Sequence, residues 1–122
     1  MLRIAKSHEW ARLDGEVVSV GITAYAVEQL GDIVYIELPK VGAKTKAGQA
    51  FGEIESVKAA AELLAPLDGV VLAVHTALTD DLDSLQQDAY DKGWMIRLKP
   101  DHPAQLDKLM TAGQYDDYVK TL

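Results

Sequence analysis

The sequence contains no cysteine and no long apolar run. The absence of cysteine excludes disulfide bridges, thiolate metal sites and cysteine nucleophiles. Any thiol chemistry would therefore have to use sulfur from a cofactor. A membrane-spanning helix needs about 20 mostly apolar residues in succession, and the sequence offers none, so we expect no membrane span. The first residues also lack the apolar core of a signal peptide, which predicts a cytoplasmic protein.

Positive charge is scarce. The 122 residues include 12 basic and 19 acidic side chains, which give a formal net charge of -7. An acidic surface repels phosphate backbones, so we expect no nucleic-acid partner. The same charge suits contact with basic pockets on partner proteins. The length allows one compact domain, residues 1–122, and is too short for two ordinary ones.

Two segments of the sequence resemble each other, residues 14–23 and residues 68–76. Each begins with Asp-Gly and continues into a valine-rich run, a pattern typical of a turn that leads into a strand. Further strands are predicted at 33–38, 43–46 and 94–98. Many short strands favour a β-sandwich or flattened barrel, here with two similar halves.

A few short helices complete this expectation. One is predicted at 25–30, where Thr23 can supply the N-cap oxygen and Gly31 can occupy the left-handed position that ends a helix. The acidic segment 79–92 is predicted to be a loop, in which one helical turn can form.

The last part of the chain, at about 103–120, is predicted to be helical. Pro103 suits the first position of a helix. Leu106, Leu109 and Met110 have the spacing of an apolar helix stripe that packs on the sheet. A short last helix is predicted at 115–120.

The segment from about 50 to 65 is predicted to form a hairpin. Ile54 alternates with Glu53 and Glu55, which is the period of a half-buried strand. After the tip, Ala61 and Leu63 alternate with an acidic residue in the same way. Lys58 falls at the tip.

Most catalytic arrangements are excluded. The three histidines lie in separate segments without the spacing of metal ligands, so we interpret them as surface or packing residues. The sequence has no glycine-rich phosphate loop and no Gly-x-Ser-x-Gly motif.

Lys58 is the remaining candidate. Nearby carboxylates favour its ammonium form, so it is a poor nucleophile, but a tip position makes it a good acceptor for acylation by another enzyme. The tip lacks the Asn-Gly or Asp-Gly pair of a two-residue turn. On the hairpin pattern alone, a simple solvated charge is therefore the favoured interpretation.

Several motifs change that ranking, because they resemble motifs of the glycine cleavage system H protein family. They occur in the same order as in that family and cover nearly the whole chain. The core around the lysine, Glu-Ser-Val-Lys-Ala, is the most specific of them. A biotin carrier would have methionine on both sides of the lysine, and a dehydrogenase lipoyl domain would have Asp-Lys-Ala. The matching motifs are Ser7-His8-Glu9-Trp10, Val20-Gly21-Ile22-Thr23, Leu30-Gly31-Asp32-Ile33-Val34, Leu38-Pro39-Lys40-Val41-Gly42, Glu55-Ser56-Val57-Lys58-Ala59, Gly93-Trp94 and Leu106-Asp107-Lys108-Leu109-Met110.

The resemblance implies a mostly β fold, a lipoyl-domain-like barrel-sandwich hybrid of two antiparallel sheets with short helices, including a C-terminal helix. It implies lipoate attached covalently to Lys58 and no catalytic activity of the chain itself. It further implies four kinds of partner: lipoylating enzymes, a glycine decarboxylase that uses pyridoxal phosphate, a tetrahydrofolate-dependent aminomethyltransferase, and dihydrolipoyl dehydrogenase.

The resemblance also implies a groove on the carrier that shelters the loaded arm. By matching motifs, its contacts would fall on Ser7, on Glu9 and on the acidic residue four positions after the lysine. That residue is Glu62, where the family more often has aspartate. For Ser7 and Glu9, an ordinary cap at the end of a strand is an open alternative.

Some positions depart from the family pattern: His75 stands where asparagine is common, Ala61 replaces a usual serine, and residues 80–92 lack several usual loop residues. Two alternatives stay open, and these departures support the first of them. One is an H-like lipoate-binding protein of another pathway, such as sulfur oxidation or lipoyl relay. The other is a non-covalent interaction module in which Lys58 is never modified.

Overall fold

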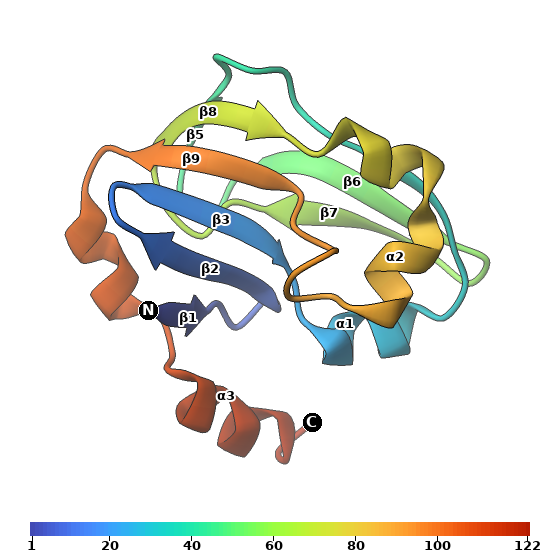
Figure 1. The fold of residues 1–122 in the computed structure, drawn as a ribbon. Helices are drawn as coiled ribbons and strands as arrows, with labels where there is room; N and C mark the ends of the chain where they lie inside the picture. Colours follow the sequence, from blue (N-terminus) through green and yellow to red (C-terminus); the bar gives the residue numbers. More distant parts are fainter.

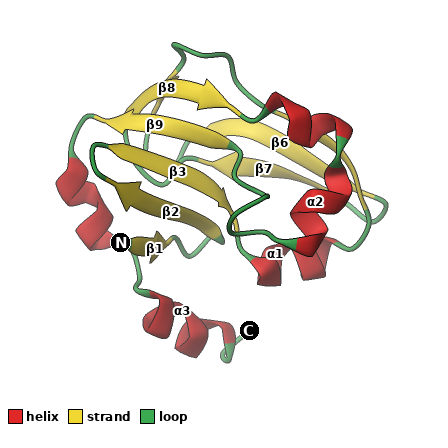
Figure 2. Cartoon of the chain, in the orientation of Figure 1, coloured by secondary structure: helices red, strands yellow, loops and turns green.

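The computed structural model describes residues 1–122 as two antiparallel β-sheets with short helices around them (Figures 1 and 2). The larger sheet has six strands in the order β1-β2-β3-β9-β8-β5, and the smaller has three in the order β4-β6-β7. The predicted mostly β fold of two antiparallel sheets is confirmed. The strands are β1 (Leu2–Ile4), β2 (Glu9–Asp14), β3 (Val17–Ile22), β4 (Ile33–Glu37), β5 (Lys44–Thr45), β6 (Ala50–Ser56), β7 (Ala60–Leu64), β8 (Gly69–Val74) and β9 (Ile96–Pro100).

The two similar segments of the sequence form strands β3 and β8, which lie on either side of β9. The glycines of their Asp-Gly pairs have different structural roles, however. Gly15 has a φ of 63° in the turn between β2 and β3, where a left-handed backbone favours glycine. Gly69 lies within the sheet, and a Cβ there would come within 2.7 Å of the Lys99 carbonyl oxygen. The second glycine is therefore needed for close backbone packing.

The core consists of three clusters of buried apolar side chains, two large ones and a small one of Ile4, Trp10 and Tyr115. Phe51 on β6 packs against both large clusters and so connects them. Trp10 is fully buried beside them, and its indole Nε1–H donates to the carbonyl oxygen of Ala89 at 3.0 Å. This bond satisfies the one polar atom of the indole away from water.

The two short α-helices predicted around 25–30 and 115–120 are confirmed. Helix α1 (Ala24–Leu30) begins where the Thr23 hydroxyl accepts a hydrogen bond from the Ala26 N–H at 3.2 Å. It ends at Gly31, whose φ is 78°. Helix α3 (Ala112–Val119) begins with a reciprocal capping box between Thr111 and Gln114. None of the helices has the length and apolar composition of a membrane-spanning segment.

The prediction of a loop at 79–92 is wrong for its first half. A 3₁₀ helix η1 (Thr76–Asp80) and helix α2 (Leu82–Gln87) occupy this segment. Leu78 and Leu85 are both buried in the core. Their burial stabilises the two helical turns even though the exposed face of the segment is strongly acidic.

The prediction of an α-helix that carries Leu106, Leu109 and Met110 on one face is also wrong. The segment is a 3₁₀ helix, η2 (Pro103–Lys108), which ends before Leu109. Met110 instead pairs with Ile4: the Ile4 N–H donates to the Met110 carbonyl at 2.8 Å, and the Met110 N–H donates to the Ile4 carbonyl at 2.9 Å. This pairing requires extended backbone, which a helix through the position would not allow.

Two strands differ in detail from the expectation. The strand predicted at 43–46 is the two-residue strand β5. Its Thr45 is buried, and the hydroxyl donates to the Leu67 carbonyl at 3.0 Å. The last strand begins two residues later than predicted, at Ile96.

Candidate functional site

Lys58 lies at the tip of the β6–β7 hairpin, which projects at the edge of the molecule (green in Figure 1). Its side chain is exposed. The two ion pairs of the structure are Arg12–Asp14 and Lys120–Asp117, so no carboxylate holds the Lys58 ammonium. The Lys58 Cε lies 3.6 Å from the position that a Cβ would take at Gly31. The lysine stem therefore lies beside a residue without a side chain, and its end is accessible.

The tip is ordered by the buried hydroxyl of Ser56, which the sequence analysis did not single out. Its Oγ accepts from the backbone N–H of Lys58 at 3.2 Å and of Ala59 at 3.1 Å, and it donates to the Ala59 carbonyl at 3.2 Å. The Val57 N–H also donates to the Asp32 carbonyl, at 3.0 Å. The sequence of the tip has no Asn-Gly pair to form the turn. The hydrogen bonds of the Ser56 hydroxyl hold the turn instead.

Ser56→Ala is expected to lower the free energy of unfolding by about 1 kcal/mol, because two backbone donors lose their side-chain acceptor. It is also expected to slow acylation of Lys58, the modification that the sequence resemblance implies, since a loosened tip presents the amine in more orientations. Denaturant unfolding and the initial rate of modification by a purified lipoate ligase measure the two effects. Ser84→Ala, which removes a hydroxyl on α2, is the control and should leave the modification rate unchanged. Wild-type values of both quantities for Ser56→Ala would contradict this role.

A groove with a volume of about 260 Å³ runs beside this hairpin, between β7, helix α1 and the segment that precedes β2. Ser7, Glu9 and Glu62, which the sequence analysis connected with the arm, all line it. Lys58 lies outside the groove, four residues before Glu62 on the hairpin. The other lining residues are His8, Ile22, Tyr25, Ala26, Gln29, Leu30, Ile54, Ala61 and Leu63.

Glu9 is the buried charged residue of the groove: the residue as a whole is only 3% exposed. It accepts a hydrogen bond from the Ser7 hydroxyl, and its Oε2 accepts from the Leu64 N–H at 3.2 Å. Burial raises the pKa of Glu9, while the hydrogen bonds from Ser7 and Leu64 oppose this effect. Glu9 therefore connects the start of β2 to β7 and also places a carboxylate in the wall of the groove.

The raised pKa of Glu9 predicts how the difference in stability between the wild type and Glu9→Gln changes with pH. Because the folded state holds the proton more tightly than the unfolded state, Glu9 contributes stability below its unfolded pKa, and this contribution is lost as the pH rises through the folded pKa. The wild type should thus lose stability relative to Glu9→Gln over the pH range just above the ordinary glutamate pKa, and the difference should level off at higher pH. Chemical denaturation of both proteins across this range measures it. A pH-independent difference would contradict the assignment.

Glu62 lies at the rim of the groove. It is exposed on β7, directly opposite Glu53 on β6, which in turn lies opposite Glu37 on β4. Like charges in directly opposite positions repel each other. A positive group near Glu62 would relieve this repulsion, so the rim favours a cation.

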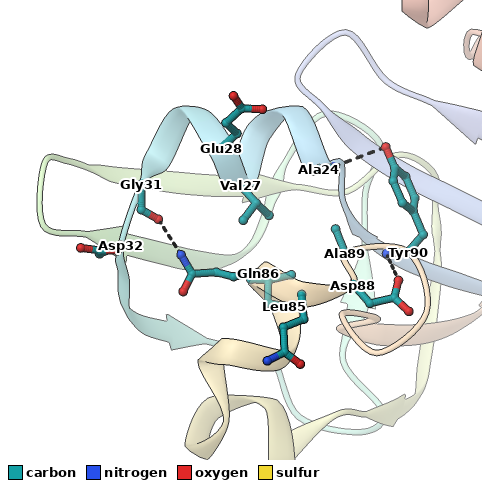
Figure 3. Close-up of a pocket in the computed structure, with 11 residues that line it drawn as sticks. Ala24, Val27, Glu28, Gly31, Asp32, Leu85, Gln86, Asp88, Ala89 and Tyr90 are labelled. Carbon is teal, nitrogen blue, oxygen red and sulfur yellow. Dashed lines mark hydrogen bonds between the residues drawn. The ribbon is translucent and has the colours of Figure 1, made fainter.

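A second, larger cavity of about 550 Å³ lies between α1 and the segment that contains α2 (Figure 3). None of the residues predicted for the site line it. The Gln86 side chain donates to the Gly31 carbonyl at 3.2 Å, and the Ala24 N–H donates to the Tyr90 hydroxyl at 3.3 Å. These bonds join the two walls of the cavity, so we interpret it as a seam between packed elements despite its greater volume.

His75, one of the departures from the family pattern, is a packing residue. Its ring stacks on the indole of Trp94, with centroids 4.4 Å apart and an angle of 6° between the planes. Its Nδ1 lies 2.6 Å from the Trp94 carbonyl oxygen, so this nitrogen carries a proton. No group of three or more histidine, cysteine or acidic side chains is arranged to hold a metal ion.

The chain matches the model of a protein family described as the glycine cleavage H-protein, over residues 2–122. The match includes the hairpin and all the groove residues described above.

Individual relatives agree with this match. The chain is 50% identical to a glycine cleavage system H protein of Geobacillus kaustophilus over 118 residues, which is 97% of this chain and 93% of the relative. It is 48% identical to the protein of the same name in Acaryochloris marina over 119 residues, 98% of this chain and 93% of the relative. The crystal structure of a glycine cleavage system H protein from Mycobacterium marinum superposes with a TM-score of 0.90 at 36% identity, covering 98% of this chain and 96% of that one.

Proposed function

The chain belongs to the glycine cleavage H-protein family, and from that premise we propose that Lys58 is the residue to which its lipoyl group is attached. Members of this family are non-catalytic lipoyl carriers, and this protein is one. It works with the other components of the glycine cleavage system, the glycine decarboxylase, the aminomethyltransferase and dihydrolipoyl dehydrogenase. The bound lipoyl group supplies two redox-active sulfur atoms, one of which carries the aminomethyl cargo between these enzymes.

The geometry of the hairpin tip is the observation that carries the assignment of Lys58. The lysine is exposed, makes no ion pair and stands on a turn that Ser56 and the β4–β6–β7 sheet hold in place. An acylating enzyme needs free access to the amine, and a defined turn fixes the direction in which it points. Attachment would convert a solvated charge into a long apolar arm without disturbing the core.

The groove fits such an arm in length. From Lys58 to Glu62 the hairpin covers four residues, or about 13 Å along a strand. A lipoyl-lysine has about 13 bonds from the Cα to the more distant sulfur, which at the spacing of an extended chain is about 15 Å. The end of the arm can therefore reach the groove that Ser7 and Glu9 line.

We assign the groove residues different roles toward the loaded arm. The buried Glu9 carboxylate, held by Ser7 and Leu64, is in position to accept a hydrogen bond from the ammonium of the aminomethyl cargo. Glu62 at the rim would attract the same positive charge as it approaches. Ile54 and Leu63, both buried, provide apolar surface that excludes water from the cargo.

The proposal includes the organisation of the chain and its location. Residues 1–122 act as a single carrier domain, with the acceptor hairpin at about 50–65 and two helical segments, η2 and α3, within about 103–120. The connection of the two large core clusters through Phe51 supports this. A cytoplasmic location is supported by the bacterial relatives. Cell fractionation with an antibody against the protein tests it.

Reconstitution with purified partners tests the proposal. The lipoylated protein should support glycine-dependent release of carbon dioxide by the glycine decarboxylase from the same organism, and the unlipoylated protein should not. If the lipoylated protein fails with that enzyme, the alternative of an H-like carrier of another pathway replaces this assignment. Equal activity without lipoate would exclude a role for the arm.

A further inference from the structure

His8 stands between Ser7 and Glu9 in the groove and has an unusual backbone. Its φ is 78°, the only positive φ of a residue other than glycine in the structure. Two hydrogen bonds hold it there: the His8 N–H donates to the Ala5 carbonyl at 2.9 Å, and the Thr23 N–H donates to the His8 carbonyl at 2.9 Å. A residue other than glycine that is held in this backbone region is a candidate for a functional role.

The imidazole of His8 belongs to a chain of side-chain hydrogen bonds. Its Nδ1 lies 2.7 Å from the hydroxyl oxygen of Tyr115 on α3. That hydroxyl lies 2.8 Å from the hydroxyl oxygen of Thr23, the residue that caps α1. Three residues far apart in the sequence thus connect the groove wall to the C-terminal helix.

Counting the protons fixes the direction of every bond in this chain. The Thr23 hydroxyl oxygen already accepts from the Ala26 N–H, and Thr23 is fully buried. Its own proton must therefore go to a protein acceptor, and the Tyr115 oxygen is the one in contact. The Tyr115 hydroxyl then donates its proton to Nδ1 of His8. Nδ1 is an acceptor, so the neutral ring carries its proton on Nε2.

From this accounting we propose that Thr23 and Tyr115 are positioning residues that hold His8 in the Nε2–H tautomer, so that the free nitrogen of the ring in the groove wall is a donor and not a base. The inference rests on the proposed function, because it concerns cargo carried in this groove. Burial lowers the pKa of His8 and raises that of Tyr115, so that both groups are neutral near pH 7, which agrees with this arrangement.

The tautomer matters because the cargo is stable only as long as its nitrogen stays protonated. When a base removes a proton from the ammonium, the nitrogen lone pair forms a C=N bond, the C–S bond breaks and its electrons go to sulfur. The removed proton then reaches the sulfur, and water hydrolyses the released iminium ion, CH2=NH2+, to formaldehyde and ammonium. A ring held as the Nε2–H tautomer offers no lone pair at its free nitrogen for the first of these steps.

Nitrogen NMR of the unlipoylated protein tests the tautomer directly. The wild type should show Nε2 of His8 protonated and Nδ1 unprotonated. Tyr115→Phe keeps the ring but removes the hydroxyl. It should lower the ratio of the Nε2–H tautomer to the Nδ1–H tautomer by about fivefold, the factor that one net hydrogen bond contributes. Tyr118→Phe is the matched control: its ring lies on the same helix 6.4 Å from the His8 ring, and its hydroxyl makes no hydrogen bond. It should leave the ratio unchanged.

The lifetime of the loaded protein gives the second readout. After loading, loss of the aminomethyl mass should be several times faster in Tyr115→Phe than in the wild type or Tyr118→Phe, as followed by intact mass spectrometry. A wild-type His8 protonated on Nδ1, or a Tyr115→Phe variant with an unchanged tautomer ratio and an unchanged lifetime, would overturn the inference. Failure of the proposed function would look different, because Lys58 would then carry no lipoyl group in any of these proteins.

Discussion

Lys58→Arg is expected to abolish lipoylation and carrier activity completely while the free energy of unfolding stays within about 0.5 kcal/mol of the wild type. Arginine keeps the positive charge and most of the apolar stem, but its guanidinium is not acylated by an enzyme that acts on an amine. The exposed tip contributes little packing, so the substitution leaves the packing of the core unchanged. Intact mass after expression with a lipoate ligase measures modification, and urea unfolding measures stability.

The matched control is Lys44→Arg, which makes the same exchange on the exposed side of the short strand β5. It should be lipoylated as fully as the wild type. A loss of thermal stability in Lys58→Arg but not in Lys44→Arg would mean that Lys58 is structural. Full lipoylation of Lys58→Arg would move the attachment point to another lysine.

Leu85→Ala is expected to lower the free energy of unfolding by about 2–5 kcal/mol. Leu85 on helix α2 is fully buried, and its packing is tight: a Cβ added at Gly93 would come within 2.8 Å of its Cδ1. Removal of three carbon atoms would leave a cavity that the surrounding sheet and α1 cannot easily fill. Chemical denaturation gives the magnitude.

Leu72→Ala serves as its control, because Leu72 on β8 is 46% exposed and the same truncation there should cost much less. If Leu85→Ala costs no more than Leu72→Ala, the segment after β8 is a peripheral loop, as its acidic sequence suggested. The structure instead makes this segment one wall of the core.

Local sequence patterns were sufficient to predict a helix or strand where one clear signal, such as a capping residue or an alternation of apolar and polar residues, marked it. Helix α1 was predictable because Thr23 and Gly31 mark its two ends, and the β6 strand because Ile54 alternates with two glutamates. In the segment 79–92 the aspartates suggested a loop, although Leu78, Leu82 and Leu85 have the spacing of a buried helix face. The apolar spacing, and not the charge, decided the structure, since burial of the leucines outweighs the low helix propensity of aspartate.

Features that depend on contacts between distant residues could not be predicted from the sequence. Met110 is extended because it pairs with Ile4, and no local signal near Met110 indicates that partner. The hydrogen-bond chain of His8, Thr23 and Tyr115 likewise joins residues separated by up to 107 positions. Ser56 had a local signal, a hydroxyl just before the turn, but its capping role becomes clear only with the tip geometry.

The site itself was only partly accessible to pattern reasoning. Hairpin signals alone favoured an ordinary solvated Lys58, and the resemblance of the Glu-Ser-Val-Lys-Ala core to the family reversed that ranking. The structure brings Ser7, Glu9 and Glu62 to one groove, but it adds a distinction that the sequence did not offer. Glu9 is buried and hydrogen-bonded, whereas Glu62 lies at the rim opposite another carboxylate.

The most direct test of the central assignment is the mass of the intact protein from a host that makes lipoate, followed by peptide mapping. We predict one lipoyl group per chain, located on the peptide that contains Lys58 and on no other. A chain that remains stoichiometrically unmodified under these conditions, or one that carries the group on a different lysine, would contradict the account.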